Sequence, residues 1–180
     1  MTDHESDHEP DHEPDRERIA LLDELAAQRR HVLGILDGLD DEALRRPVLP
    51  SGWSCVGLVQ HLALDVERFW FRQVMPGTPS LEPRPGSLAD LEDAWQVDPA
   101  TPAASVIEGY RRETELADAA IGGLALDAAP GWWPDFFGDY RMDDLREVVL
   151  HVIVETAAHA GHLDVVRELL DGRQWMVLTD

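Results

Sequence analysis

Four side chains that can bind metal or transfer protons recur at helical spacing near the carboxyl end of the chain. His151, Glu155, His159 and His162 are separated by four, four and three residues. They therefore fall on one stripe of a helix whose flanking positions are apolar. A lone carboxylate in such a stripe is costly to bury unless it has a partner. A divalent metal bound by Glu155 and His159 would supply that partner, because residues at i and i+4 can reach the same ion.

A third ligand has to come from a facing helix, since one helix offers hardly more than two well-placed ligands. The best candidate is His61, which lies within an apolar run at residues 58–63. A histidine alone among apolar residues is more often a hydrogen-bonded core residue. A Glu/His stripe alone is more often a solvated or salt-bridged face. The combination of His61 with Glu155 and His159 favours a metal site over these two alternatives.

Two polar residues that could line the cavity and bind substrate follow His61, and they are expected to lie on its face of the helix. Asp65 lies one turn after it and Arg68 a further turn on. Arg68 could bind a substrate carboxylate, or it could pair with Asp65 or Glu155. Three protein ligands leave coordination positions open, as in catalytic sites. Nitrogen and carboxylate ligands suit Zn²⁺, with Ni²⁺, Mn²⁺ or Fe²⁺ as alternatives.

Helical periodicity predicts four segments that would position these residues. They run from about 16 to 36, from Ser54 to the stop at 76–77, from Thr101 to about 124, and from about 143 to 170. Ser54 and Thr101 are the expected N-caps of the second and third, and Pro102 is the expected first helical residue of the third. No run alternates as a strand would. We therefore expect residues 16–180 to form one all-α domain, a four-helix bundle.

Three other segments have distinctive composition. Residues 1–15 form an acidic leader with a repeated Asp-His-Glu-Pro unit and no apolar residue after Met1, so we expect it to be disordered. Its histidines could bind metal weakly, or the leader could act only as a solubilising extension. A loop rich in Pro and Gly covers 76–101, with one helical turn at about 88–95. The segment 129–141 carries aromatic residues that either cover the metal as a lid or pack on the core: Trp132, Trp133 and Phe137.

The overall charge excludes two classes of partner. The formal net charge is −21 and no lysine is present, so phosphate backbones and anionic lipids would be repelled. No apolar run approaches the roughly 18 residues of a membrane span, and the amino-terminal residues do not form a signal peptide. The single cysteine, Cys55, excludes an internal disulfide and is expected to be a small buried residue. These features indicate a cytoplasmic protein.

Two motifs resemble the DinB-like superfamily. Ser51-Gly52-Trp53-Ser54 followed by His61 is similar to the start of that superfamily's second helix, and the segment 155–162 is similar to its fourth-helix signature, H-x3-H-x-G-Q. The resemblance covers about residues 16–172. It implies an up-down-down-up four-helix bundle whose metal ligands match His61, Glu155 and His159.

The chain departs from the commonest pattern of the superfamily at two positions. Glu155 stands where many relatives have His, and the same His/Glu/His set occurs in the mycothiol-dependent maleylpyruvate isomerase branch, which it therefore favours. His162 stands where Gln is common and would support the ligands or serve as a spare ligand. His151, one turn before Glu155, would be a supporting or structural residue.

The resemblance implies a metal-dependent enzyme that acts on a low-molecular-weight thiol, either mycothiol or bacillithiol. The thiolate would attack an electrophilic substrate, giving S-transfer, conjugation or isomerisation. The contacts to both molecules are expected from the loops at 76–101 and 129–141. A homodimer is a further expectation. The alternative is a stress-linked or interaction module that binds metal without catalysis.

Overall fold

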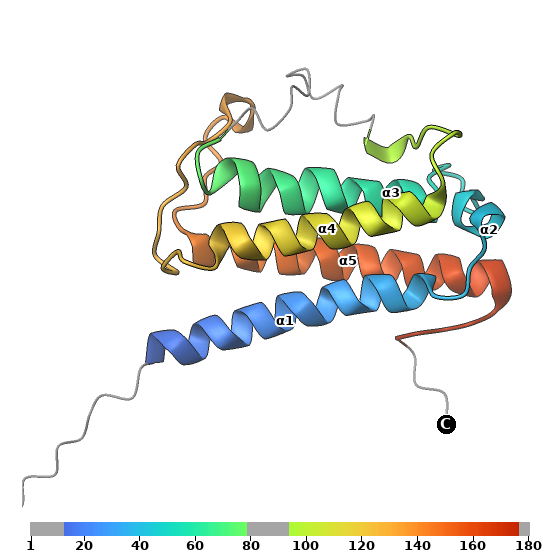
Figure 1. Cartoon of the computed structure of the whole chain (residues 1–180), viewed down its shortest axis with the longest axis horizontal. Helices are drawn as coiled ribbons and strands as arrows, with labels where there is room; N and C mark the ends of the chain where they lie inside the picture. The colour runs from blue at the N-terminus through green and yellow to red at the C-terminus, as the bar shows by residue number, and fades with distance from the viewer. Residues whose placement is uncertain (1–12, 79–93, 177–180) are drawn as a thin grey trace, which may run out of the picture.

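The computed structural model describes residues 13–78 and 94–176, and the regular structure within them is entirely helical. The elements are α1 (Glu13–Leu36), α2 (Asp41–Arg45), α3 (Cys55–His61), the π-helix η1 (Leu62–Val74), α4 (Ala103–Ile121), the 3₁₀ helix η3 (Asp135–Phe137) and α5 (Leu145–Asp171). α3 continues directly into η1, so α1, α3–η1, α4 and α5 make four long units. α1 and α5 run in one direction and the other two in the opposite direction (Figure 1). This confirms the predicted all-α four-helix bundle and its up-down-down-up order.

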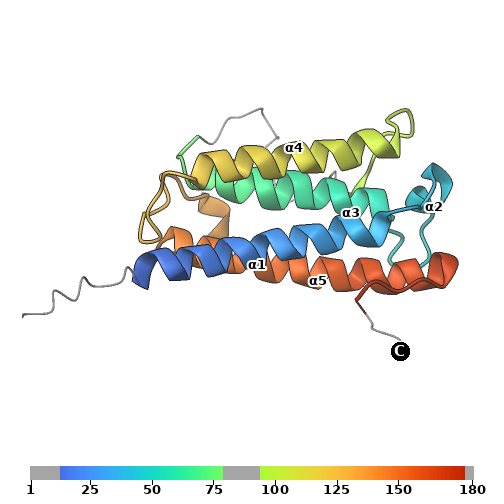
Figure 2. The same ribbon diagram turned by 60° about the horizontal axis from the view of Figure 1, so that its bottom comes forward.

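The apolar faces of these four units meet in a single core. α1 lies beside α5, and η1 lies beside α4 (Figures 1 and 2). Each unit contributes fully buried side chains, among them Leu25, Phe71, Tyr110 and Val152. Burial of a side chain of this size stabilises the fold by roughly 1.5–3 kcal/mol. No helix of the described residues is long and apolar enough to cross a membrane.

Side-chain caps define the starts of the helices that carry the candidate ligands. Ser54 Oγ accepts a hydrogen bond from the Gly57 N–H at 3.2 Å, so α3 begins where its N-cap predicted. Asp144 caps α5 in the same way, at Glu147 N–H. α5 ends at Gly172, whose φ of 77° is the left-handed conformation that glycine adopts freely. The long α5 therefore spans the bundle as the periodicity predicted.

The starts of α1 and α4 differ from the prediction. Residues 13–15 of the expected disordered leader are the first turn of α1, and residues 1–12 lie outside the described residues. Pro14 and two acidic residues suit a helix start. The N–H groups of the first turn have no partner within the helix, so proline costs no hydrogen bond there. The amino-terminal end of a helix also favours negative charge. α4 begins at Ala103, and Pro102 is its cap instead of its first residue. The carboxylate of Asp41 accepts the Ala103 N–H at 2.8 Å, so α2, which the sequence did not predict, replaces Thr101 as the capping element.

The winding of η1 changes the faces on which its side chains lie. A π-helix takes more residues per turn than an α-helix, so seven residues no longer bring a side chain back to the same face. Arg68 accordingly points to α4, where its Nη2 lies 2.6 Å from Glu113 Oε1, and Arg72 binds the other oxygen. The expectation that Arg68 shares the face of His61 and pairs with Asp65 or Glu155 is therefore wrong. Burial would raise the pKa of Glu113, but the two guanidinium groups hold it below its usual value.

A buried ion pair joins α1 to η1. Arg29 Nε donates to Glu67 Oε1 and Arg29 Nη2 donates to Glu67 Oε2, both at 2.7 Å. Arg29 Nη1 donates to Asp118 of α4, also at 2.7 Å. The side chains of Arg29 and Glu67 are 8% and 1% exposed. Charges so far from water are tolerated only when each keeps its partner. The pair therefore constrains how α1, η1 and α4 lie relative to one another.

We predict that Arg29→Ala lowers the free energy of unfolding by about 3–5 kcal/mol, because it leaves the Glu67 carboxylate buried without its partner. Urea unfolding followed by far-UV circular dichroism measures this loss. The matched control is Arg111→Ala, which removes an exposed pair with Glu108 at 3.5 Å and should change the free energy by under about 1 kcal/mol. Equal, small effects for both variants would contradict the assigned role of the buried pair.

Candidate metal centre

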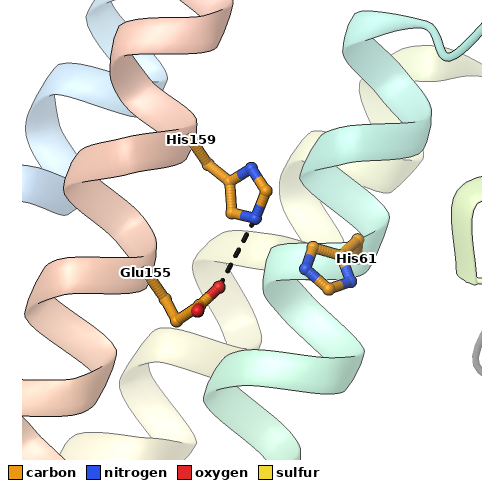
Figure 3. Close-up of side chains that lie close together, drawn as sticks. All are labelled: His61, Glu155 and His159. Atoms are coloured by element: carbon orange, nitrogen blue, oxygen red, sulfur yellow. Dashed lines mark ion pairs between the residues drawn. The ribbon is translucent and has the colours of Figure 1, made fainter. Parts of the chain in front are cut away.

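The three residues singled out from the sequence converge between α3 and α5. His61 is the last residue of α3, and Glu155 and His159 lie one turn apart on α5 (Figure 3). Each offers a ligand atom, and these atoms lie within 4.8 Å of one another. His159 Nε2 and Glu155 Oε2 are 3.5 Å apart. Two nitrogens and a carboxylate oxygen from two facing helices thus surround one point.

Helix periodicity explains why α5 presents Glu155 and His159 together. Its buried face carries Val152, Thr156 and Ala160, and the two candidate ligands lie on an adjoining face that meets α3 and η1. The side chains of His61 and His159 are 17% and 15% exposed, whereas that of Glu155 is 40% exposed. The site is thus largely screened from water and open on the side of Glu155.

Asp65 orients the ring of His61. Its Oδ2 lies 3.0 Å from His61 Nδ1, and its side chain is only 7% exposed. In the tautomer that donates from Nδ1 to Asp65, Nε2 carries the lone pair. One ring nitrogen of His61 faces Glu155 and His159 (Figure 3). A metal-binding imidazole commonly donates its other ring N–H to a carboxylate, which fixes its orientation. Asp65 lies on the His61 face, as its spacing predicted.

The local electrostatics favour the protonation states that bind a cation. The contact with His159 lowers the pKa of Glu155, aided by the nearby imidazoles of His151 and His61 and opposed by burial. Its carboxylate is therefore ionised at neutral pH. Burial lowers the pKa of His151, so that imidazole is neutral near pH 7. One charged oxygen and two nitrogens, with an acidic residue behind one of them, fit a divalent cation.

The other residues predicted for the site lie around this group. His162 is exposed and lies beside His159, with ring centroids 5.6 Å apart, but it is not one of the three converging ligands. His151 packs its ring against Trp70 at 4.8 Å. Trp70 in turn stacks on Phe137 at 5.6 Å. The aromatic segment 129–141 therefore packs on the end of η1, and Phe137 is linked to His151 through Trp70.

One close neighbour of the site had no signal in the sequence. Trp95 stacks on the imidazole of His61, with centroids 4.5 Å apart and planes inclined by 19°. It comes from the connection between η1 and α4, where no periodicity links a residue to a distant helix. The helical turn expected at about 88–95 falls mostly outside the described residues, of which Ala94 and Trp95 form a short 3₁₀ segment.

Comparison with known proteins places the chain in a family. The model of a family described as mycothiol-S-transferase matches residues 20–172. No curated protein sequence and no solved structure matches the chain. This family is DinB-like, which confirms the superfamily that the two motifs resembled. The matched model is that of S-transferases, whereas Glu155 had favoured the isomerase branch. Since the match runs from within α1 to the residue after α5 and includes all three candidate ligands, the chain belongs to the mycothiol S-transferase family.

Proposed function

We propose that the protein is a metal-dependent mycothiol S-transferase whose cation, most simply Zn²⁺, is held by His61, Glu155 and His159. The observation that carries this proposal is the convergence of their ligand atoms within 4.8 Å, on two facing helices. Membership of the mycothiol S-transferase family supports the thiol as the second element of the site. Bacillithiol, the other thiol expected from the sequence, has no such support.

The arrangement suits activation of a thiol. A divalent cation lowers the pKa of a thiol placed beside it and stabilises the thiolate near neutral pH. A cation held by three protein ligands would leave coordination positions for that sulfur. The sulfur would then bond to an electrophilic carbon as the bond from that carbon to its leaving group breaks, and the thiol proton would pass to solvent.

The surrounding residues hold the ligands and screen the site. Asp65 keeps His61 in one orientation through its bond to Nδ1. Trp70 packs between Phe137 and His151, one turn before Glu155 on α5. Arg68 is bonded to Glu113 on α4, and a role for it toward a substrate carboxylate stays a prediction. Because Glu155 is the most exposed ligand, the thiol and the electrophile approach past its carboxylate.

We also propose that the protein acts in the cytoplasm as a homodimer. Burial raises the pKa of its single cysteine, Cys55, to about 11, so little thiolate forms near neutral pH. A single cysteine also cannot form the internal disulfides typical of oxidising compartments. Four apolar side chains of α5 are about half exposed and would be covered by a second copy: Leu150, Val154, Val165 and Leu169. Light scattering of the purified protein tests the dimer.

The first prediction concerns metal content. Full-length protein in which His4, His8 and His12 are replaced by Asn, so that the leader cannot bind metal, should hold about one divalent cation per chain. His61→Ala and Glu155→Ala should lose it while keeping their helical circular dichroism, because the apolar faces carry the core. His31→Ala, on α1 outside the site, is the matched control. Metal analysis that finds equal content in the wild type and His61→Ala contradicts the site.

The second prediction concerns the thiol. Calorimetric titration should show mycothiol binding to the metal-loaded protein and no binding after chelation, because the thiolate needs the cation to stay ionised. Restoring Zn²⁺ should restore binding. If mycothiol and bacillithiol bind equally well to the metal-free protein, or to neither form, the enzyme proposal fails. A metal-binding module without catalysis would then be the better account.

The third prediction concerns Asp65. Asp65→Ala should weaken metal binding by roughly 10- to 100-fold, the usual effect of removing the carboxylate behind a histidine ligand. Asp65→Asn should be affected less, because its amide oxygen can still accept from Nδ1. Competition with a chromophoric chelator measures both affinities. Wild-type affinity in Asp65→Ala would show that His61 needs no such support.

A further inference from the structure

A tryptophan from outside the four long helices covers the imidazole of His61. Trp95 stacks on that ring at 4.5 Å and lies 5.7 Å from the ring of His159, inclined by 62°. Trp53, which precedes the N-cap of α3, packs at 6.4 Å against Trp95. Trp95 is therefore in contact with two of the three candidate ligands, although it can coordinate nothing itself.

The backbone on both sides of Trp95 is attached to the helix that carries His61. The side-chain nitrogen of Gln60 donates to the carbonyls of Ala94, at 2.9 Å, and of Gln96, at 3.2 Å. The Trp95 carbonyl lies so close to Gly57 that a Cβ there would be 2.4 Å from its oxygen. Only glycine allows this approach. The segment 94–96 is thus fixed on α3 within four residues of His61.

We propose that Trp95 is a positioning residue for His61, an inference that rests on the proposed metal site. Asp65 sets the direction of Nδ1, and stacking on Trp95 restrains the plane of the ring. Together, Asp65 and Trp95 orient the ring of His61 so that its Nε2 faces Glu155 and His159. Metal sites require ligands held to about 0.5 Å, which packing of this kind provides.

Titration with Co²⁺ tests the inference, because its visible absorption reports the ligand geometry and it quenches nearby tryptophan emission. Full-length protein carrying the three Asn substitutions in the leader is compared with the same protein bearing Trp95→Ala or Trp95→Phe. Trp95→Ala should bind Co²⁺ about 10-fold more weakly and with altered absorption bands. Trp95→Phe keeps a ring to stack on His61, so its affinity should stay within about twofold and its bands unchanged. The Trp95→Phe variant should lose most of the quenching of tryptophan emission by Co²⁺.

Gly57→Ala tests the same contact without altering Trp95. Its new Cβ displaces the segment 94–96, so Co²⁺ should bind more weakly and quench less. The matched control is Gly109→Ala on α4, where a Cβ meets nothing within 4 Å. Wild-type affinity and bands in both Trp95→Ala and Gly57→Ala would overturn the role of Trp95 and leave the metal site standing. Absence of Co²⁺ binding in the parent protein would overturn the proposed function and this inference together.

Discussion

The ion pair between Arg29 and Glu67 constrains the geometry on which the candidate centre depends. Glu67 lies on η1, six residues after His61, and Arg29 lies on α1, which packs against α5. Two parallel hydrogen bonds between buried, charged groups tolerate little sliding of α1 along η1. Since α5 packs on both α1 and η1, the position of His61 relative to Glu155 and His159 follows from this pairing. A shift of one helical turn would separate the ligands.

Because the winding changes from α to π after His61, the polar side chains of this helix face two different neighbours, α5 and α4. His61 and Asp65 serve the centre beside α5, whereas Arg68 and Arg72 both bind Glu113 of α4. In a regular α-helix, Arg68 would return to the face of His61 and place a positive charge near the candidate centre. The wider turns of η1 remove that charge from the centre. The net charge of −21 acts in the same sense, since it attracts divalent cations to the molecule.

The candidate centre combines strong local order with one open side. His61 is held by Asp65 and Trp95, while the side chain of Glu155 is 40% exposed. A side chain held in its orientation before a ligand arrives needs little further ordering when one binds.

Features that depend on local spacing could be predicted from the amino-acid sequence. The i and i+4 positions of Glu155 and His159, the cap at Ser54 and the four apolar periodicities are properties of single helices, so the bundle and two candidate ligands could be inferred from them. His61 was inferred from the need for a ligand on a second helix and from a motif that precedes it. The partners that meet across the bundle could be found only in the folded structure. Neither the stacking of Trp95 on His61 nor the pairing of Arg68 with Glu113 leaves a trace in local spacing, because such contacts depend on the path of a loop and on the winding of a helix.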